Sequence, residues 1–270
     1  MVRVGVHCPV NKALSSVIDW AKEIQSNTAQ YFLQNPHTYQ PRKVTRKEWN
    51  SFYRMATTEG ISPIFIHAPY VVNLCSTNES VREKSAIVIQ NLLHVIEDKP
   101  DTYLIVHVGY HGGSSFESGF LRFRESLNSI QGTFAIHKLV IENSAGQTNA
   151  MGGSLEELSC LLDAFPGMGV CMDTAHLWGF GITPKDNTLH RVLSGWQDQQ
   201  RLRVIHLNNS KDELGSKKDH HAKLNQGRIS EDDLKSFAKV FQQIPFILET
   251  PKNSLEEDSE QIRIFKQWFY

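Results

Sequence analysis

The stretch between Arg203 and Gly227 combines a buried strand with side chains that commonly bind metal ions. An apolar run ends in His206, and about a dozen residues later the chain presents Asp219 and His221, separated by one residue. Neutral imidazole and carboxylate together suit zinc and similar divalent ions. A core strand does not need a histidine at its tip, and a solvated loop does not need this pair. The pattern therefore predicts metal binding.

Other apolar runs end in the same residue types. The strands expected within six consecutive runs end in His67, His107, Glu142, Asp173, His206 and Glu249. Three further candidates follow these runs on loops, namely His176, Asp219 and His221. A single histidine at a strand end is usually a hydrogen-bonded core residue, but six such residues at one end are hard to explain by packing. Nine candidates exceed the four or five ligands of one zinc ion, so we expect bridging carboxylates and two or three ions.

The spacing of these residues predicts the elements that position them. Eight short apolar runs cover residues 2–7, 29–33, 64–70, 103–109, 139–144, 168–173, 204–207 and 246–251. Amphipathic segments predict helices near residues 12–26, 45–59, 79–98, 115–129, from 154 onward, 188–197, 230–242 and 256–268. Thr45 with Glu48, and Ser154 with Glu157, have the spacing of helix capping boxes.

This alternation predicts an α/β fold of the (β/α)8 TIM barrel type. The runs are continuously apolar, as in strands buried on both faces, and 270 residues divided by eight units is about 34 residues per unit. No linker composition interrupts the chain, so we expect a single domain, residues 1–270. The active site of this fold lies at the C-terminal mouth of the strands, where the run-ending residues would meet.

The overall composition narrows the class of protein only slightly. The formal net charge is −1, which argues mildly against a purely electrostatic nucleic-acid binder. The cysteines, Cys8, Cys75, Cys160 and Cys171, include no C-x-x-C pair, as in reduced intracellular proteins. The first strand begins almost at once, and no apolar run approaches the ~20 residues that cross a bilayer. We expect a soluble, intracellular protein with no membrane partner.

A cluster of divalent ions suits hydrolysis of a phosphodiester. Such ions lower the pKa of bound water and stabilise the attacking and leaving oxygens of an in-line displacement at phosphorus. A metal-dependent sugar isomerase on the same barrel is the alternative, but it would need one or two ions and would have no use for Asp219 and His221. A non-enzymatic binder of DNA lesions would be expected to lack some of the ligands.

The ordered set of motifs resembles the endonuclease IV family of apurinic/apyrimidinic (AP) endonucleases. The resemblance rests on HAPY at His67, His107, ENSAG at Glu142, DTAH at Asp173, HLN at His206, DHH at Asp219 and ET at Glu249. It covers essentially the whole chain. It implies a monomeric barrel with three Zn²⁺ ions, with Mn²⁺ able to replace zinc. It also implies cleavage of double-stranded DNA on the 5′ side of an abasic site, in base-excision repair, leaving a 3′-hydroxyl and a 5′-deoxyribose phosphate.

The resemblance also implies a role for each ligand. His67, His107 and Glu142 would hold one zinc. Glu142 would bridge to a second zinc, whose other ligands are Asp173, His206 and Glu249. The third zinc would be held by His176, Asp219 and His221. A hydroxide that bridges the first two ions would attack the phosphorus, and Glu142 would be the catalytic residue that orients it.

The expected DNA contacts lie on the loops at the mouth. By resemblance, Tyr70 is a wedge that fills the gap left by a flipped-out abasic nucleotide, with Val71 beside it. Asn35 matches a polar position after the second strand. Gln147, Asn208 and Lys211 are expected to contact phosphate or sugar. Residues 8–13 lack the family's usual glycine pair, and residues 36–39 lack its arginine and tryptophan. Because these loops contact DNA in the family, the departures bear on the range of DNA substrates.

Overall fold

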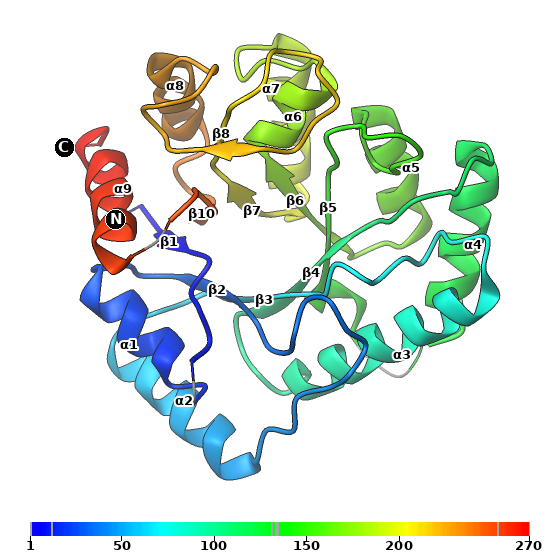
Figure 1. Cartoon of the computed structure of the whole chain (residues 1–270), viewed down its shortest axis with the longest axis horizontal. Coiled ribbons are helices and arrows are strands. Elements are labelled where there is room, and N and C mark those ends of the chain that lie inside the picture. Colours follow the sequence, from blue (N-terminus) through cyan, green and yellow to red (C-terminus); the bar gives the residue numbers. More distant parts are fainter. Residues whose placement is uncertain (1, 12, 131, 133–134, 253, 270) are drawn as a thin grey trace.

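The computed structural model describes residues 2–11, 13–130, 132, 135–252 and 254–269. Eight parallel strands form a barrel surrounded by helices (Figure 1). Its strands are β1 Val4–Val6, β2 Ala29–Phe32, β3 Ile64–His67, β4 Thr102–His107, β5 Leu139–Glu142, β6 Gly169–Asp173, β7 Leu202–His206 and β10 Phe246–Leu248. This is the (β/α)8 barrel that the alternation of apolar runs predicted.

The barrel closes between its first two strands. The hydrogen-bonded order of the strands runs from β1 through β10, β7, β6, β5, β4 and β3 to β2. A parallel bridge between His7 and Gln30 then joins the two ends. The backbone N–H of Cys8 donates to the carbonyl oxygen of Gln30 at 2.7 Å and extends this closure. The closure brings the ends of β1 and β2 next to the strands that carry the predicted ligands.

The helices lie outside the strands, as the amphipathic segments predicted. They are α1 Ser16–Glu23, α2 Arg46–Thr58, α3 Glu79–Ile96, α4 Phe116–Asn128, α5 Leu155–Ala164, α6 Thr174–Phe180, α7 Asn187–Asp198, α8 Glu231–Val240 and α9 Leu255–Gln267. Thr45 and Ser154 cap α2 and α5, since each hydroxyl accepts a hydrogen bond from the N–H three residues on. Among the described residues, no helix has the length and apolar character that would let it cross a membrane.

The strands are buried on both faces, which explains their continuous apolar character. The barrel interior is filled by the inward-facing residues Phe65, Ile105, Val140, Cys171, Val204 and Ile247, all fully buried. The other face of each strand packs against the helices in a larger core. This interior layer forms an apolar floor beneath the polar residues at the strand ends.

Two local features differ from the expectations, and one expectation cannot be compared. The segment after Asp173 was expected to be a loop, but it is the short helix α6, because the Asp173 carboxylate caps it by accepting from the N–H of His176 at 2.9 Å. The seventh loop contains a small antiparallel pair, β8 Asn209–Ser210 with β9 His221–Ala222. Lys12, where the first helix was expected to begin, lies outside the described residues.

Candidate metal centre

The C-terminal ends of the barrel strands carry the predicted ligands. Five of them are the last residues of β3 to β7, in the order His67, His107, Glu142, Asp173 and His206, and Glu249 directly follows β10. The parallel register places His107 beside Glu142, and Asp173 beside His206. Since parallel strands end at the same edge, these side chains converge on one mouth of the barrel.

The three remaining ligands come from the segments beyond β6 and β7. His176 lies in the first turn of α6 and is held there by the Asp173 cap. His221 is placed by the β8–β9 pair, in which it lies opposite Ser210. Asp219 precedes it and reaches the same place: its Oδ1 atom lies 3.1 Å from Nε2 of both His176 and His221.

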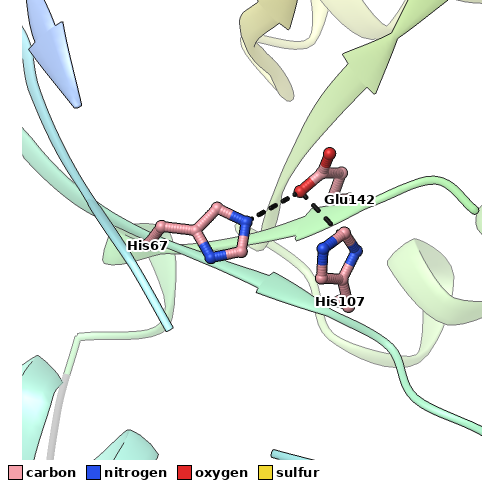
Figure 2. Close-up of side chains that lie close together, drawn as sticks. All are labelled: His67, His107 and Glu142. Carbon is pink, nitrogen blue, oxygen red and sulfur yellow. Dashed lines mark hydrogen bonds and ion pairs between the residues drawn. The ribbon is translucent and has the colours of Figure 1, made fainter. Parts of the chain in front are cut away.

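The first group of ligands consists of His67, His107 and Glu142. Oε2 of Glu142 lies 3.2 Å from Nε2 of His67 and 3.7 Å from Nδ1 of His107 (Figure 2). The carboxylate faces both rings, which come from β3 and β4. Their ligand atoms are close enough together to bind one ion.

The second group shares Glu142 with the first and adds Asp173, His206 and Glu249. Nδ1 of His206 lies 3.0 Å from Oε1 of Glu142, 3.2 Å from Oε2 of Glu249 and 3.9 Å from Oδ2 of Asp173. The two oxygens of Glu142 therefore face different groups, with Oε2 toward the first and Oε1 toward the second. That is the geometry of a bridging carboxylate.

The third group consists of Asp173, His176 and His221, with Asp219 in contact. Nε2 of His176 and Nε2 of His221 are buried, and among the described residues neither has a hydrogen-bond partner of acceptable geometry. Buried polar atoms are normally satisfied. Two unsatisfied imidazole nitrogens beside one carboxylate oxygen are the arrangement expected of atoms that coordinate a cation, so the residues fit a metal ion.

Backbone carbonyls orient three of the five imidazoles. Nδ1 of His67 lies 2.7 Å from the carbonyl oxygen of Ala68, and Nδ1 of His176 lies 2.9 Å from that of Asn143. Nδ1 of His221 lies 3.2 Å from the backbone oxygen of Glu249. A carbonyl oxygen only accepts, so Nδ1 carries the proton and the lone pair of Nε2 faces the site. Such contacts fix the tautomer of metal-binding histidines.

The electrostatics of the cluster favour charged carboxylates. Burial opposes the charge on Glu142, but attraction to His107 and His206 outweighs burial and holds the pKa of Glu142 well below its usual value. Burial likewise opposes protonation of His221, yet Asp173 and Asp219 raise the pKa of this imidazole to about 9. Without metal, protons on His176, His206 and His221, whose pKa values are all raised by neighbouring carboxylates, thus balance the buried negative charge. A metal ion would replace those protons.

Comparisons with known proteins agree with this geometry. A family model described as "Xylose isomerase-like TIM barrel" matches residues 18–268. "Probable endonuclease 4" of Haloarcula marismortui is 31% identical over 261 residues, covering 93% of each chain. "Probable endonuclease 4" of Natranaerobius thermophilus is 30% identical over 277 residues, covering 98% of this chain and 97% of the relative. The crystal structure of endonuclease IV from Thermus thermophilus has a TM-score of 0.83 at 30% identity, covering 98% of both chains. The chain belongs to the endonuclease IV family of these barrels.

As an endonuclease IV family member, the protein is an enzyme, a hydrolase that acts on phosphodiester bonds. The crystal structure of a D-tagatose 3-epimerase-like protein is also similar, with a TM-score of 0.73 over 98% of this chain and 96% of that one. Its sequence is 17% identical, which shows a shared barrel fold alone. The comparisons therefore favour the nuclease over the sugar isomerase.

Tyr70 lies over the first ligand group in this endonuclease IV family member. Its side chain is 56% exposed, and its ring centroid lies 5.9 Å from that of His67 and 6.3 Å from that of His107. Val71 is partly buried, and its carbonyl oxygen accepts a hydrogen bond from the Tyr39 hydroxyl at 2.8 Å. An exposed ring held directly above these candidate ligands is in a position to contact a bound substrate.

The other predicted DNA contacts are more scattered. Gln147 lines a cavity of about 220 Å³ together with Tyr70 and His107, and its buried Oε1 atom has no hydrogen-bond partner among the described residues. Asn35 is exposed at the rim of a second cavity, of about 720 Å³. Lys211 is exposed on the seventh loop. These three residues are accessible to a ligand at the mouth.

Asn208 does not lie where a DNA contact would require it. Its side chain is fully buried. The amide nitrogen donates to Oδ2 of Asp173 at 2.6 Å, and the amide oxygen accepts from the N–H of Glu249 at 2.7 Å. Because both ends of the amide bind to ligand residues, we reassign Asn208 from contacting DNA to holding the second ligand group in place.

Three further residues lie beside the candidate ligands although their sequence context did not predict a role there, namely Gln30, His7 and Cys171. Gln30 is fully buried within β2 and lies 2.7 Å from His206 through its Oε1 atom. His7 lies 3.3 Å from Oε1 of Glu249. Cys171 is close to Glu142 and His206 on the barrel floor. Two features of the sequence could have indicated this cluster: Gln30 is a polar residue inside an apolar run, and His7 ends the first apolar run.

Proposed function

We propose that this protein is a zinc-dependent AP endonuclease of DNA base-excision repair. It hydrolyses the phosphodiester on the 5′ side of an abasic site in double-stranded DNA and leaves a 3′-hydroxyl and a 5′-deoxyribose phosphate. The observation that carries the proposal is the convergence of nine histidine and acidic side chains in three groups, linked through Glu142 and Asp173. Membership of the endonuclease IV family supports the same reaction.

Three Zn²⁺ ions are proposed, one in each group. His67, His107 and Glu142 would hold the first ion. Glu142 would also reach the second, together with Asp173, His206 and Glu249. The third would be held by His176, Asp219 and His221. Mixed nitrogen and oxygen donors suit zinc, and Mn²⁺ accepts the same donors.

The chain's own residues then have distinct tasks. Bound divalent ions supply a lowered pKa for water and neutralise the charge that develops at phosphorus. Glu142 is buried, and its two oxygens face two ligand groups. It would therefore fix the position of the two groups relative to each other and orient the attacking water. Tyr70, exposed above His67 and His107, covers this position and would stack in the gap of a distorted duplex. The reaction needs no nucleophilic side chain.

A sugar isomerase remains the second candidate, on the strength of the shared fold. The third ligand group argues against it. Asp219 and His221 are presented by a loop with its own two-stranded pair, and their contacts with His176 serve no purpose in a site of one or two ions.

The test is cleavage of an end-labelled duplex that carries one tetrahydrofuran abasic analogue, with an undamaged duplex as control and the metal content of the same sample measured by mass spectrometry. The expected result is a single cut 5′ to the lesion with close to three zinc ions per chain. Three ions without cleavage would refute the substrate but keep the metal centre. One ion, no cleavage and turnover of a ketose would support the isomerase.

A further inference from the structure

The first two strands of the barrel provide none of the nine proposed ligands, but they contribute a polar cluster beside the second group. Gln30 in β2 is fully buried. Its Nε2 atom lies 2.6 Å from Oε1 of Glu249 and 2.9 Å from Nδ1 of His7, and its Oε1 atom lies 2.7 Å from Nε2 of His206. Both ends of one amide therefore contact ligands of the same group.

The donor and acceptor of each hydrogen bond in this cluster follow from the chemistry of its groups. Oε1 of Glu249 lies 2.6 Å from Nε2 of Gln30, and the two oxygens of this carboxylate also face ring nitrogens of His7 and His206. A carboxylate only accepts, so the Gln30 NH₂ group must face it. The Gln30 carbonyl oxygen then faces His206 and also only accepts. Nε2 of His206 must therefore donate to it, and Nδ1 is the atom available to a cation.

His206 is thereby distinguished from three other imidazoles of the centre. His67, His176 and His221 each place Nδ1 on a backbone carbonyl and turn Nε2 toward the site. In His206 the roles are reversed: Nδ1 faces the carboxylates of Glu142 and Glu249, and Nε2 faces a side chain. A backbone carbonyl is supplied by any sequence, but the partner of His206 depends on residue 30 being an amide.

We propose that Gln30 is the positioning residue of the second metal ion, setting the tautomer of His206 and orienting the Glu249 carboxylate through the two ends of its amide. The inference rests on the proposed metal centre. Partners that lie behind the ligands of a metal typically contribute 10–100-fold to affinity. Gln30 contacts two proposed ligands of one ion, Glu249 and His206, and makes no hydrogen bond to the third ligand group among the described residues. Its removal should therefore weaken one ion selectively.

The test compares Gln30→Met with Gln34→Met. Methionine has nearly the shape of glutamine but cannot make these hydrogen bonds. Gln34 is a matched control, because it is also buried and lies two residues beyond β2. Among the described residues, its side chain hydrogen-bonds only to the backbone oxygen of Thr38, at 3.5 Å. Metal-free samples are titrated with zinc against a competing chelator, and circular dichroism confirms that each variant is folded.

In the wild type and in Gln34→Met we expect three ions of unchanged affinity. In Gln30→Met we expect two unchanged ions and one that binds about 10–100-fold more weakly. Unchanged binding of all three ions in Gln30→Met would overturn the inference. So would equal weakening of all three, or the same loss in Gln34→Met, because both results indicate a general structural effect.

A second measurement does not depend on any variant. Nitrogen NMR of isotope-labelled histidine in the zinc-loaded wild type reports which ring nitrogen carries the proton. We expect the proton of His206 on Nε2 and those of His67, His176 and His221 on Nδ1. A proton on Nδ1 of His206 would overturn the inference while leaving the proposed function intact. A wild type that binds no zinc would instead refute the proposed metal centre.

Discussion

Removal of the metal ions should destabilise the folded chain strongly. Glu142 and Asp173 are 1% and 0% exposed, and they lie within ligand groups that also contain Glu249 and buried imidazoles. An ion that binds the folded chain and not the unfolded one adds its binding free energy to stability, so chelation subtracts it.

The size of the effect follows from the number of sites. At a free concentration of 100 times Kd, each ion contributes about 2.7 kcal/mol, so three proposed ions contribute about 8 kcal/mol. An unfolding entropy of about 2.1 cal/mol/K per residue gives about 570 cal/mol/K for 270 residues. Dividing the lost binding free energy of about 8 kcal/mol by this unfolding entropy predicts a fall in Tm of about 14 °C on chelation.

The assay is calorimetry of zinc-loaded and chelator-treated protein, followed by stepwise return of zinc. Recovery of Tm should be complete near three ions per chain. Mg²⁺ is the matched control, because it prefers oxygen ligands and octahedral geometry and should restore little. A fall of less than about 3 °C, or equal recovery with Mg²⁺, would refute the reasoning that these side chains form three zinc sites.

Three further outcomes are expected. Glu142→Gln should reduce kcat for the abasic duplex by at least about 1000-fold, because it removes a bridging charge but keeps the side-chain shape; near-normal turnover would contradict the proposed mechanism. Tyr70→Ala should weaken binding of abasic duplex by about 10-fold or more with unchanged metal content, since base–aromatic stacking contributes about 1–3 kcal/mol; loss of zinc would show a structural role. Zinc affinity should rise with pH up to about 9. The pKa of His221 is raised, so its imidazole must lose a proton before it can bind zinc. Calorimetry in buffers of different ionisation enthalpy measures that release, and its absence at pH 7 would contradict the assignment of His221. In the metal-free chain, the free energy of unfolding should instead fall as pH rises. The stabilisation from protonated His221 is complete below the unfolded pKa of about 6.5 and is lost as pH rises through about 9.

The positions of most ligands could be predicted because they follow from strand order. A residue that ends an apolar run in a parallel barrel must lie at the C-terminal mouth, whatever the details of packing. His67, His107 and Glu142 are found at that edge for this reason. The loop residues Asp219 and His221 were suggested by their types and their spacing, but the β8–β9 pair that holds them was not predicted.

The barrel, the edge where the candidate ligands gather and the kinds of side chain found there could all be inferred from the order of residues along the chain. The folded structure was needed to tell which polar residues are exposed at the mouth and which are buried against the candidate ligands. Asn208 lies just beyond β7 and Gln30 lies within β2, and the residue types of these two amides do not distinguish them from the exposed Asn35. Their roles depend on the closure of β1 against β2 and on which neighbouring atoms satisfy each buried amide. Those contacts join residues as much as 219 positions apart, as Gln30 and Glu249 are, so they arise only in the folded barrel.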